Sequence, residues 1–323
     1  MEWVNEIDSL IFSGGGVRGI VFVGALEELQ QQYPAVLKQL KNVSGTSIGA
    51  ILALLLACRI ELSRIKMLFC SSLWNALYQE IDLSGLFYHL GMLDSMKAIW
   101  PSVVQFLAHP EETFAELKHR TGINLLVCVT NVDTKRYEYH SAELTPLYSV
   151  AKSVVASCAL PVIFSPVVIH NRRYVDGGVL NNTPVSDFLH LRKTLILRIV
   201  NAHPIGGGGN GNNSGGGGSG TTSTRIVDHL SDLLYAMADF IEDEQMKQIP
   251  SEFRNHIVPF SFDRQELTSY NFSLTERQRH EICETGRKTM HTFLKSPHII
   301  VAEILTSFIM NYANAGLSGS TSS

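Results

Sequence analysis

Five residues, Gly45-Thr46-Ser47-Ile48-Gly49, match the pattern G-x-S-x-G, which is typical of a serine nucleophile on a sharp strand-to-helix turn. In that arrangement the serine hydroxyl is exposed at the carboxyl end of a strand and can attack an ester carbonyl. Gly45 and Gly49 lack the Cβ atoms that would collide in such a turn. A β-prone piece, 40–44, precedes the pattern and apolar helix formers, 48–57, follow it. The sequence therefore predicts a nucleophile elbow with Ser47 at its tip.

A glycine-rich loop lies upstream of the elbow, between a predicted buried strand at 7–12 and a predicted helix at 20–33. Backbone N–H groups of such a loop suit an anion. The spacing is not G-x-G-x-x-G, and no Lys-Ser or Lys-Thr pair completes a P-loop, so a nucleotide phosphate is disfavoured. Because the elbow follows one strand–helix unit later, the oxyanion of acyl transfer is the favoured anion. The predicted oxyanion-hole loop contains Gly14, Gly15, Gly16, Arg18 and Gly19. We interpret Arg18 as structural or electrostatic support, with binding of a lipid phosphate as the alternative.

Two further blocks follow in order, Ala156-Ser157-Cys158-Ala159-Leu160-Pro161 and a stretch at 174–185 that contains Asp176-Gly177-Gly178. With the glycine loop and the elbow, they resemble the patatin-like phospholipase family over about residues 7–200. The resemblance implies an α/β fold with a central, mainly parallel sheet and helices on both faces, in three layers. It also implies a lipid acyl hydrolase with a Ser-Asp dyad, in which Gly177 and Gly178 support the acid as Gly45 and Gly49 support the serine.

The serine needs a base within hydrogen-bonding distance, and two solutions compete. In a Ser-His-Asp triad the histidine would follow the acid, and His203, after a predicted strand at 194–200, is the best placed of seven candidates. In a dyad Asp176 is the direct base, at the end of a predicted strand at 172–175 and before two glycines that allow close approach to Ser47. Burial would raise the pKa of Asp176 toward the working range. We favour the dyad.

Composition restricts the class of protein. The net charge of −4 and the lack of a basic stripe argue against nucleic acid as a main partner. Five cysteines lie mostly in apolar runs without a C-x-x-C pattern, which predicts buried thiols in a reducing compartment. Residues 1–8 lack the apolar core of a signal peptide, and the longest apolar run, 48–58, is too short to cross a bilayer. We expect a cytoplasmic protein that contacts membranes only peripherally.

The chain is predicted to form one domain, 1–316, with a flexible insertion at 205–224 rich in glycine, asparagine and serine, and a disordered tail at 317–323. Strands are predicted at 123–131, 136–140, 167–169, 172–175, 194–200 and 257–262, and helices at 149–157, from Thr183-Pro184, at 225–248, 274–293 and 297–312. The region 62–119 reads as several helices rich in aromatic residues, which predicts either core packing or an acyl-chain groove beside the nucleophile.

In the predicted helix at 225–248, apolar residues recur on one side and predict its buried face: Ile226, Leu230, Leu233, Leu234, Met237 and Ile241. The acids near its end predict a solvated face: Asp239, Glu242, Asp243 and Glu244.

These features favour a phospholipase A-like lipid acyl hydrolase that cleaves fatty-acyl esters through an acyl-enzyme, without a metal or other cofactor. Its partners would be a phospholipid or other acyl-ester lipid and the surface of a membrane or micelle. The alternatives are a soluble esterase or thioesterase, and a non-catalytic lipid-binding protein on the same fold. The oligomeric state stays open at this level.

Overall fold

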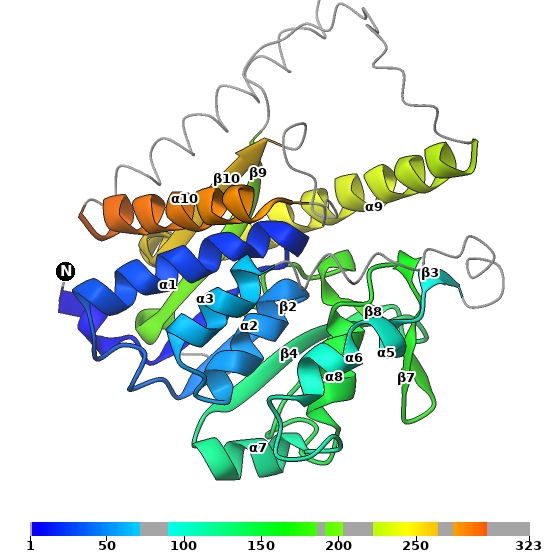
Figure 1. The fold of residues 1–323 in the computed structure, drawn as a ribbon, viewed down its shortest axis with the longest axis horizontal. Coiled ribbons are helices and arrows are strands. Elements are labelled where there is room, and N and C mark those ends of the chain that lie inside the picture. Colours follow the sequence, from blue (N-terminus) through cyan, green and yellow to red (C-terminus); the bar gives the residue numbers. More distant parts are fainter. Residues whose placement is uncertain (1, 72–89, 186–190, 203–221, 264–273, 296–323) are drawn as a thin grey trace, which may run out of the picture.

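The computed structural model describes residues 2–71, 90–185, 191–202, 222–263 and 274–295 (Figure 1). Within them, an eight-stranded sheet has the order β10-β9-β1-β2-β4-β8-β7, and β5 pairs with β4 beside that path. Its strands are β1 Ser9–Phe12, β2 Asn42–Thr46, β4 Asn124–Asn131, β5 Arg136–His140, β7 Val167–Ile169, β8 Arg172–Asp176, β9 Thr194–Ala202 and β10 Ile257–Asp263. A separate two-stranded sheet pairs β3, Gly91–Leu93, with β6, Val162–Phe164.

The centre of the main sheet is parallel, because β10, β9, β1, β2 and β4 pair in the same direction. The strands β5, β7 and β8 join it antiparallel. The predicted α/β class with a mainly parallel central sheet is therefore confirmed. The register sets Phe12 beside Gly45 and Gly45 beside Val127, so β1, β2 and β4 end at the same edge. Loops after parallel strands meet at such an edge, which is where α/β proteins place their sites.

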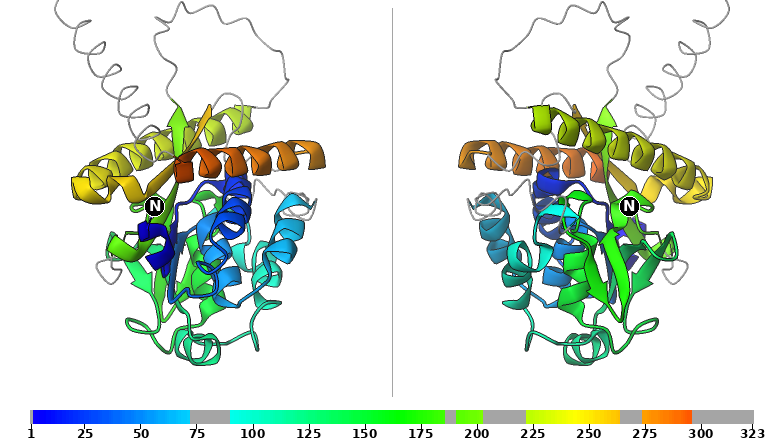
Figure 2. Two further views of the ribbon diagram at one scale, coloured as in Figure 1. Left: turned by 90° about the vertical axis from the view of Figure 1, so that its left-hand side faces the viewer. Right: turned by 90° about the vertical axis from the view of Figure 1, so that its right-hand side faces the viewer.

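Helices cover both faces of the sheet (Figures 1 and 2). Alternate residues of each strand point to opposite faces. Leu10, Phe12 and Leu125 belong to the larger apolar core, which the first helices and α8 cover. Ile11, Leu126 and Ile196 belong to a smaller cluster, closed by Ile249 and by Met246 at the end of α9. The helices are α1 Ile20–Gln32, α2 Ile48–Ala57, α3 Leu62–Cys70, α5 Ser95–Ala98, α6 Trp100–Val104, α7 Phe114–Thr121, α8 Val150–Ser157, α9 Thr222–Lys247 and α10 Glu276–Lys295; short 3-10 turns are η1 Glu2–Glu6, η2 Gly16–Gly19, η4 Gly177–Val179, η5 Leu191–Lys193 and η6 Ser251–His256.

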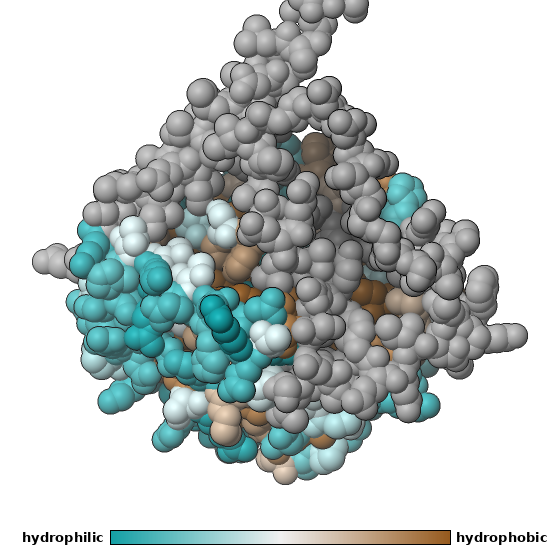
Figure 3. Space-filling model, turned by 45° about the horizontal axis from the view of Figure 1, so that its top comes forward, coloured by the Kyte–Doolittle hydropathy of each residue, from teal (hydrophilic) through white to brown (hydrophobic). Residues whose placement is uncertain are grey.

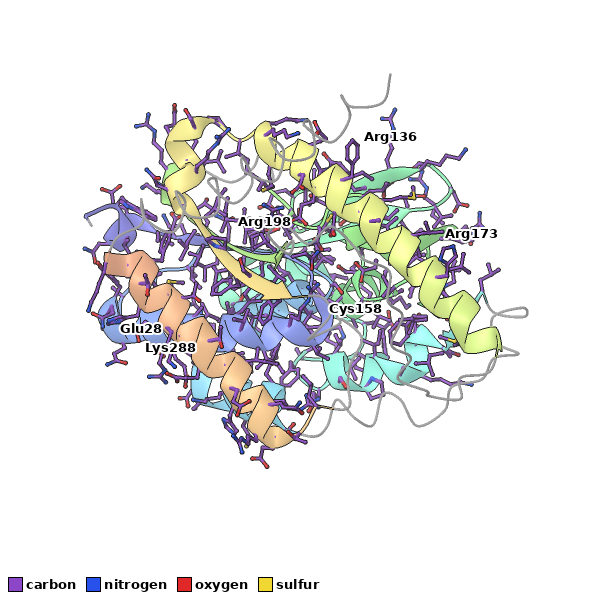
Figure 4. All side chains as sticks on the ribbon, turned by 90° about the horizontal axis from the view of Figure 1, so that it is seen from above. Glu28, Arg136, Cys158, Arg173, Arg198 and Lys288 are labelled. Carbon is purple, nitrogen blue, oxygen red and sulfur yellow. The ribbon has the colours of Figure 1, made fainter. Side chains whose placement is uncertain are left out.

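Helices α9 and α10 lie on either side of β10 when the molecule is seen from above (Figure 4). Helix α10 runs along α1 in close contact. A Cβ atom on Gly286 would lie 1.9 Å from the Val21 carbonyl oxygen, and one on Gly24 would lie 1.7 Å from the Cys283 carbonyl oxygen. The two helices therefore meet backbone to backbone, which explains a glycine in the interior of each.

The prediction for the two faces of α9 is wrong at several positions, although Glu244 is exposed as predicted and Leu234 and Ile241 are partly buried. Leu230, Leu233 and Met237, which the periodicity predicts to be buried, are exposed to 40%, 49% and 63%. Glu242, predicted to be solvated, is buried with 4% exposed, and Asp239 and Asp243 are partly buried with polar partners. The reason is that β9 and the segment after Asp176 offer charged and amide groups to this helix, and these groups stabilise the acids more than an apolar contact would.

In the region 62–119, the described part differs from a purely helical reading. The stretch predicted as one helix around 92–99 contains β3 and the short helix α5, and Pro101 lies in the first turn of α6, where a missing N–H is tolerated. The predicted segments 73–78 and 297–312, and most of the predicted helix from Thr183-Pro184, lie outside the described residues. The same holds for 205–221, while Thr222–Thr224 are already helical in α9. Among the described helices, none has the length and apolar composition that a membrane span requires.

Candidate active site

Ser47 sits at the junction of β2 and α2 with φ 55° and ψ −126°, a backbone conformation that costs energy for a residue with a Cβ. The turn is closed by glycine contacts. A Cβ atom on Gly45 would lie 2.2 Å from the Gly49 carbonyl oxygen, and one on Gly49 would lie 2.6 Å from the Phe12 carbonyl oxygen. Every residue of α2 is buried, so apolar packing holds the strained turn in place. This is the geometry that the G-x-S-x-G pattern requires.

Ser157, at the end of α8, supports the turn from outside it. The Ser47 N–H donates to Ser157 Oγ at 2.9 Å, and the Ser157 hydroxyl donates to the Cys128 carbonyl oxygen at 2.6 Å. Both bonds are buried or part-buried, so this serine links the elbow to β4 and α8. In the sequence, Ser157 stands only within a family motif, and nothing beside it signals this role.

Asp176 ends β8 and is 4% exposed. Burial is the main influence on its pKa and raises it to about 7, although the nearby Ser47 hydroxyl and the Gly178 N–H act in the opposite direction. The Gly178 N–H reaches Asp176 Oδ1 at 2.7 Å. A Cβ atom on Gly177 would lie 2.4 Å from the Cys128 carbonyl oxygen, so the turn after the acid also needs glycine. The structure thus brings Ser47 and Asp176 together.

The five residues of the predicted oxyanion-hole loop have different positions. Gly15 and Gly16 border the same hollow as Ser47, and among the described residues their N–H groups donate to no other group. The Gly14 N–H donates to the Asn182 carbonyl oxygen at 3.0 Å. Arg18 is buried and also borders this hollow, where its Nη1 donates to Asn201 Oδ1 at 2.6 Å. Gly19 allows close packing, since a Cβ there would lie 2.6 Å from Ile48.

Two hollows meet at Ser47. One, the apolar hollow, is lined mainly by aliphatic and aromatic side chains, including Val17, Ile20, Ile51, Phe69, Ile99 and Phe164. The other, the polar hollow, runs from Asp176 and the glycine loop to the inner side of α9 at Leu234, Ala238, Asp239 and Glu242. Figure 3 shows brown, apolar residues gathered at the centre of the face on which α9 and α10 lie. Phe69 and Ile99 come from the aromatic region 62–119, so part of that region borders the site.

Cys158 also lines both hollows and lies near the centre of the view in Figure 4. Burial raises the pKa of its thiol well above the ordinary value. The thiol therefore stays protonated, and a protonated thiol is a poor nucleophile. Ser47 is the better candidate of the two.

None of the described histidines after Asp176 borders either hollow: His229, His256, His280 and His291. His256 is buried against Trp3, and His291 bonds Glu28 on α1. His203 and two other candidates for a triad, His190 and His298, lie outside the described residues. Across the described ranges, no group of three or more His, Cys, Asp or Glu side chains could hold a metal ion.

Comparison with known proteins agrees with this geometry. The family model for patatin-like phospholipases matches residues 10–189, more than half of the chain. The chain therefore belongs to the patatin-like phospholipase family, a family of lipid hydrolases. The resemblance noted in the sequence is confirmed.

Relatives and structures point the same way. The chain is 26% identical over 294 residues to uncharacterized protein R571 of Acanthamoeba polyphaga mimivirus, covering 88% of this chain and 93% of that one. It is 28% identical to the probable lipid hydrolase 463L of Invertebrate iridescent virus 6, over 55% of this chain and 61% of the relative. The crystal structure of VipD from Legionella pneumophila shares the fold, with a TM-score of 0.61 at 19% identity, covering 90% of this chain and 67% of VipD.

Proposed function

We propose that this protein is a serine acyl hydrolase of phospholipase A type, in which Ser47 is the nucleophile and Asp176 the base. The observation that carries the proposal is the buried Asp176 carboxyl, which borders the same hollow as a serine on a strained elbow. A pKa of about 7 suits the task, because a general base works best when its pKa lies near the operating pH.

The reaction follows from these positions. Asp176 takes the hydroxyl proton of Ser47 while the oxygen attacks the ester carbonyl, and the carbonyl oxygen becomes an oxyanion. The N–H groups of Gly15 and Gly16, with that of Ile48 at the start of α2, stabilise this charge. The intermediate collapses to an acyl-enzyme as Asp176 returns the proton to the leaving alcohol. Water then attacks the acyl-enzyme with the same base, which releases the fatty acid and restores Ser47.

The apolar hollow favours a lipid acyl chain over a small polar acyl group. It opens at Ser47 and is walled by side chains such as Ile51, Phe69 and Ile99, which match a hydrocarbon chain. A phospholipid or another acyl-ester lipid is the substrate class we propose, in preference to a soluble ester or thioester.

The outer side of α9 supports a peripheral position at a lipid surface. Leu233, Met237 and Phe240 are exposed to 49%, 63% and 66% at the spacing of one helix face, while Leu234 and Ala238 of the same helix border the polar hollow. A lipid surface against this stripe would bring substrate to the opening of the site. The helix carries six acidic and two basic residues, so we propose a zwitterionic rather than an anionic surface.

A two-step experiment tests the proposal. The purified protein is first treated with a fluorophosphonate probe, which labels activated serines, and is then given phosphatidylcholine vesicles, with released fatty acid measured by mass spectrometry. We expect labelling and release from the wild type and neither from Ser47→Ala. Labelling without release would favour the soluble esterase or thioesterase, and absence of both from folded wild type would favour the non-catalytic lipid-binding protein.

A further inference from the structure

Helix α9 contributes a buried carboxylate, Glu242, at the inner end of the polar hollow. Its Oε1 accepts from Arg198 Nε at 2.9 Å and from the Thr183 hydroxyl, and its Oε2 accepts from Asn182 Nδ2 at 2.9 Å. Arg198 extends from β9 toward this helix (Figure 4). Burial alone would lower the pKa of Arg198, but Glu242 and Asp243 raise it above its ordinary value, so the guanidinium stays charged. The carboxylate is therefore held by three donors, one of them a cation.

Asn182, one of those donors, lies between the two loops of the proposed site. Its carbonyl oxygen accepts from the Gly14 N–H at 3.0 Å. Its side-chain Oδ1 would lie 2.4 Å from a Cβ atom on Gly14 and 3.0 Å from one on Gly178. Gly178 in turn donates to the Asp176 carboxylate. The Asn182 amide thus fills the space between the start of the glycine loop and the turn that holds the proposed base.

The same helix holds the neighbouring backbone as well. Gln245, one turn after Glu242, donates from Nε2 to the Leu180 carbonyl oxygen at 2.9 Å. The Asn181 carbonyl oxygen accepts from Thr46 Oγ1 at 3.1 Å, next to the nucleophile. The segment 180–183 is therefore fixed on one side by α9 and on the other by the elbow and the glycine loop.

We propose that Glu242 is a positioning residue for the acyl-transfer reaction: it fixes Asn182 and Thr183, and through them sets the distance between the glycine loop and Asp176. This inference rests on the proposed function of Ser47 and Asp176. According to this inference, α9 influences the rate of the chemical step, although it shares no motif with the elbow.

The chemistry of the carboxylate suggests the decisive variant. All three groups around Glu242 are donors, and a carboxylate can accept from all of them. In Glu242→Gln the shape is kept, but an NH2 group replaces one oxygen and must face a donor, either Asn182 Nδ2 or the Thr183–Arg198 pair. If the NH2 group faces Asn182, that amide has to shift or turn over, and if it faces the other pair, Thr183 and Arg198 have to move. Either change disturbs the segment that carries Asn182 and its contacts with Gly14 and Gly178.

The experiment compares Glu242→Gln with Asp243→Asn. Asp243 is the matched control, because it lies on the same helix and also pairs with Arg198, at 3.1 Å, but the structure gives it no contact with Asn182 or Thr183. Each variant is measured on a short-chain chromogenic ester for kcat and KM, and with the fluorophosphonate for both the labelling rate and the labelled fraction at completion. The fraction counts the folded, competent molecules, so a general loss of structure lowers it without changing the rate per competent molecule.

For Glu242→Gln we expect the labelling rate and kcat to fall about 10- to 100-fold, as a misplacement near 1 Å does, with KM within about twofold and complete final labelling. Asp243→Asn should keep both rates within about twofold of the wild type. Equal rates in Glu242→Gln and Asp243→Asn would overturn the proposal. If Glu242→Gln does not fold, Thr183→Val is tested in its place, because it removes one donor to Glu242 at nearly constant volume. Labelling of Thr183→Val that is several-fold slower than that of the wild type supports the proposal, and a wild-type labelling rate refutes it. Failure of the proposed function itself would be seen separately, as a wild type that is never labelled.

Discussion

Helices α2 and α9 both border the candidate site, but they are attached to the molecule in opposite ways. All ten residues of α2 are buried, and its start is pressed against β1 and β2 at distances that only glycine permits. In α9 the inner side carries Asp239, Glu242 and Asp243, bound to amides and to Arg198, and the outer side leaves Leu233, Met237 and Phe240 exposed. One helix is held by apolar packing and the other by charge-assisted hydrogen bonds.

This difference separates two tasks. Apolar packing at native density allows little movement, which suits an elbow that stores backbone strain at Ser47. A helix fixed through polar groups can leave its apolar residues for another surface, and at the same time its Glu242 carboxylate can orient the segment after Asp176. Changes near α2 and β8 should therefore affect chemistry on every substrate, whereas changes on the outer side of α9 should affect only substrates presented in a lipid surface.

The largest effect is expected at Asp176. Asp176→Asn keeps the shape but removes the base, so turnover should fall by at least about a thousandfold, close to the loss in Ser47→Ala, because the two residues act as a unit. In the wild type, kcat/KM should rise with pH and level off above an inflection near the pKa of about 7. Both are measured as initial rates on a chromogenic short-chain ester, with folding checked by circular dichroism. A folded variant with substantial turnover would exclude Asp176 as the base.

The same variant should be more stable than the wild type at alkaline pH. The native pKa of Asp176, about 7, lies above the ordinary value of 3.8, so the native state keeps a proton that the unfolded chain releases between these two values. The contribution of this group to stability is therefore present below pH 3.8 and is lost as pH rises through 7, a difference of up to about 4 kcal/mol. Asp176→Asn escapes that loss, so its melting temperature should exceed that of the wild type at pH 8 and approach it near pH 4. A lower melting temperature at pH 8 would show that the ionised carboxylate stabilises the fold.

The local structure around the candidate site could be predicted where the signal lies within a short stretch of sequence. The strands at 7–12 and 172–175, the glycine loop and the elbow each carry their information within a few residues, because sharp turns need glycine at fixed offsets and buried strands need continuous apolar runs. The order of these motifs then identified the family and its fold. The boundaries shifted little: β2 begins two residues later than the predicted strand, at Asn42.

The parts that could not be predicted depend on partners far away in the chain. Glu242 lies about 60 residues beyond Asn182 and Thr183, and nothing in its neighbours distinguishes a buried acid from a solvated one. Helical periodicity places apolar residues on one side of α9 but does not state which side faces the protein. The pairing of β3 with β6 was missed for a related reason, since three-residue strands carry too little pattern to stand out.

Replacing Ser157, which supports the elbow at the start of α2, is expected to lower turnover less than Asp176→Asn does. Ser157→Ala leaves the Ser47 N–H without its acceptor, so we expect about a tenfold lower kcat and a destabilisation of about 1–3 kcal/mol. Ser153→Ala is the matched control on the same helix: Ser153 is equally buried and bonds His140 and the Ser149 carbonyl oxygen, without touching the elbow. Thermal melting and ester kinetics on both variants make the test. If the two variants lose stability and activity in the same proportion, Ser157 supports only the fold.

The smallest effect on chemistry, and the most selective one, is expected on the outer side of α9. A double variant, Met237→Glu with Phe240→Glu, adds two charges to the exposed stripe, at side chains that are 63% and 66% exposed. Charged residues do not enter the apolar boundary of a bilayer, so hydrolysis of phosphatidylcholine vesicles should fall about tenfold. This loss is smaller than the loss expected if both wild-type side chains were fully buried in the lipid. Cleavage of a soluble short-chain ester should stay within about twofold, because neither side chain borders the hollows at Ser47.

Met67→Glu, a change at a side chain of α3 that is 64% exposed, controls for the added charge and should leave both activities unchanged. Equal losses on vesicles and on the soluble ester would mean that the stripe serves the fold, and no loss on vesicles would mean that lipid reaches Ser47 from another side.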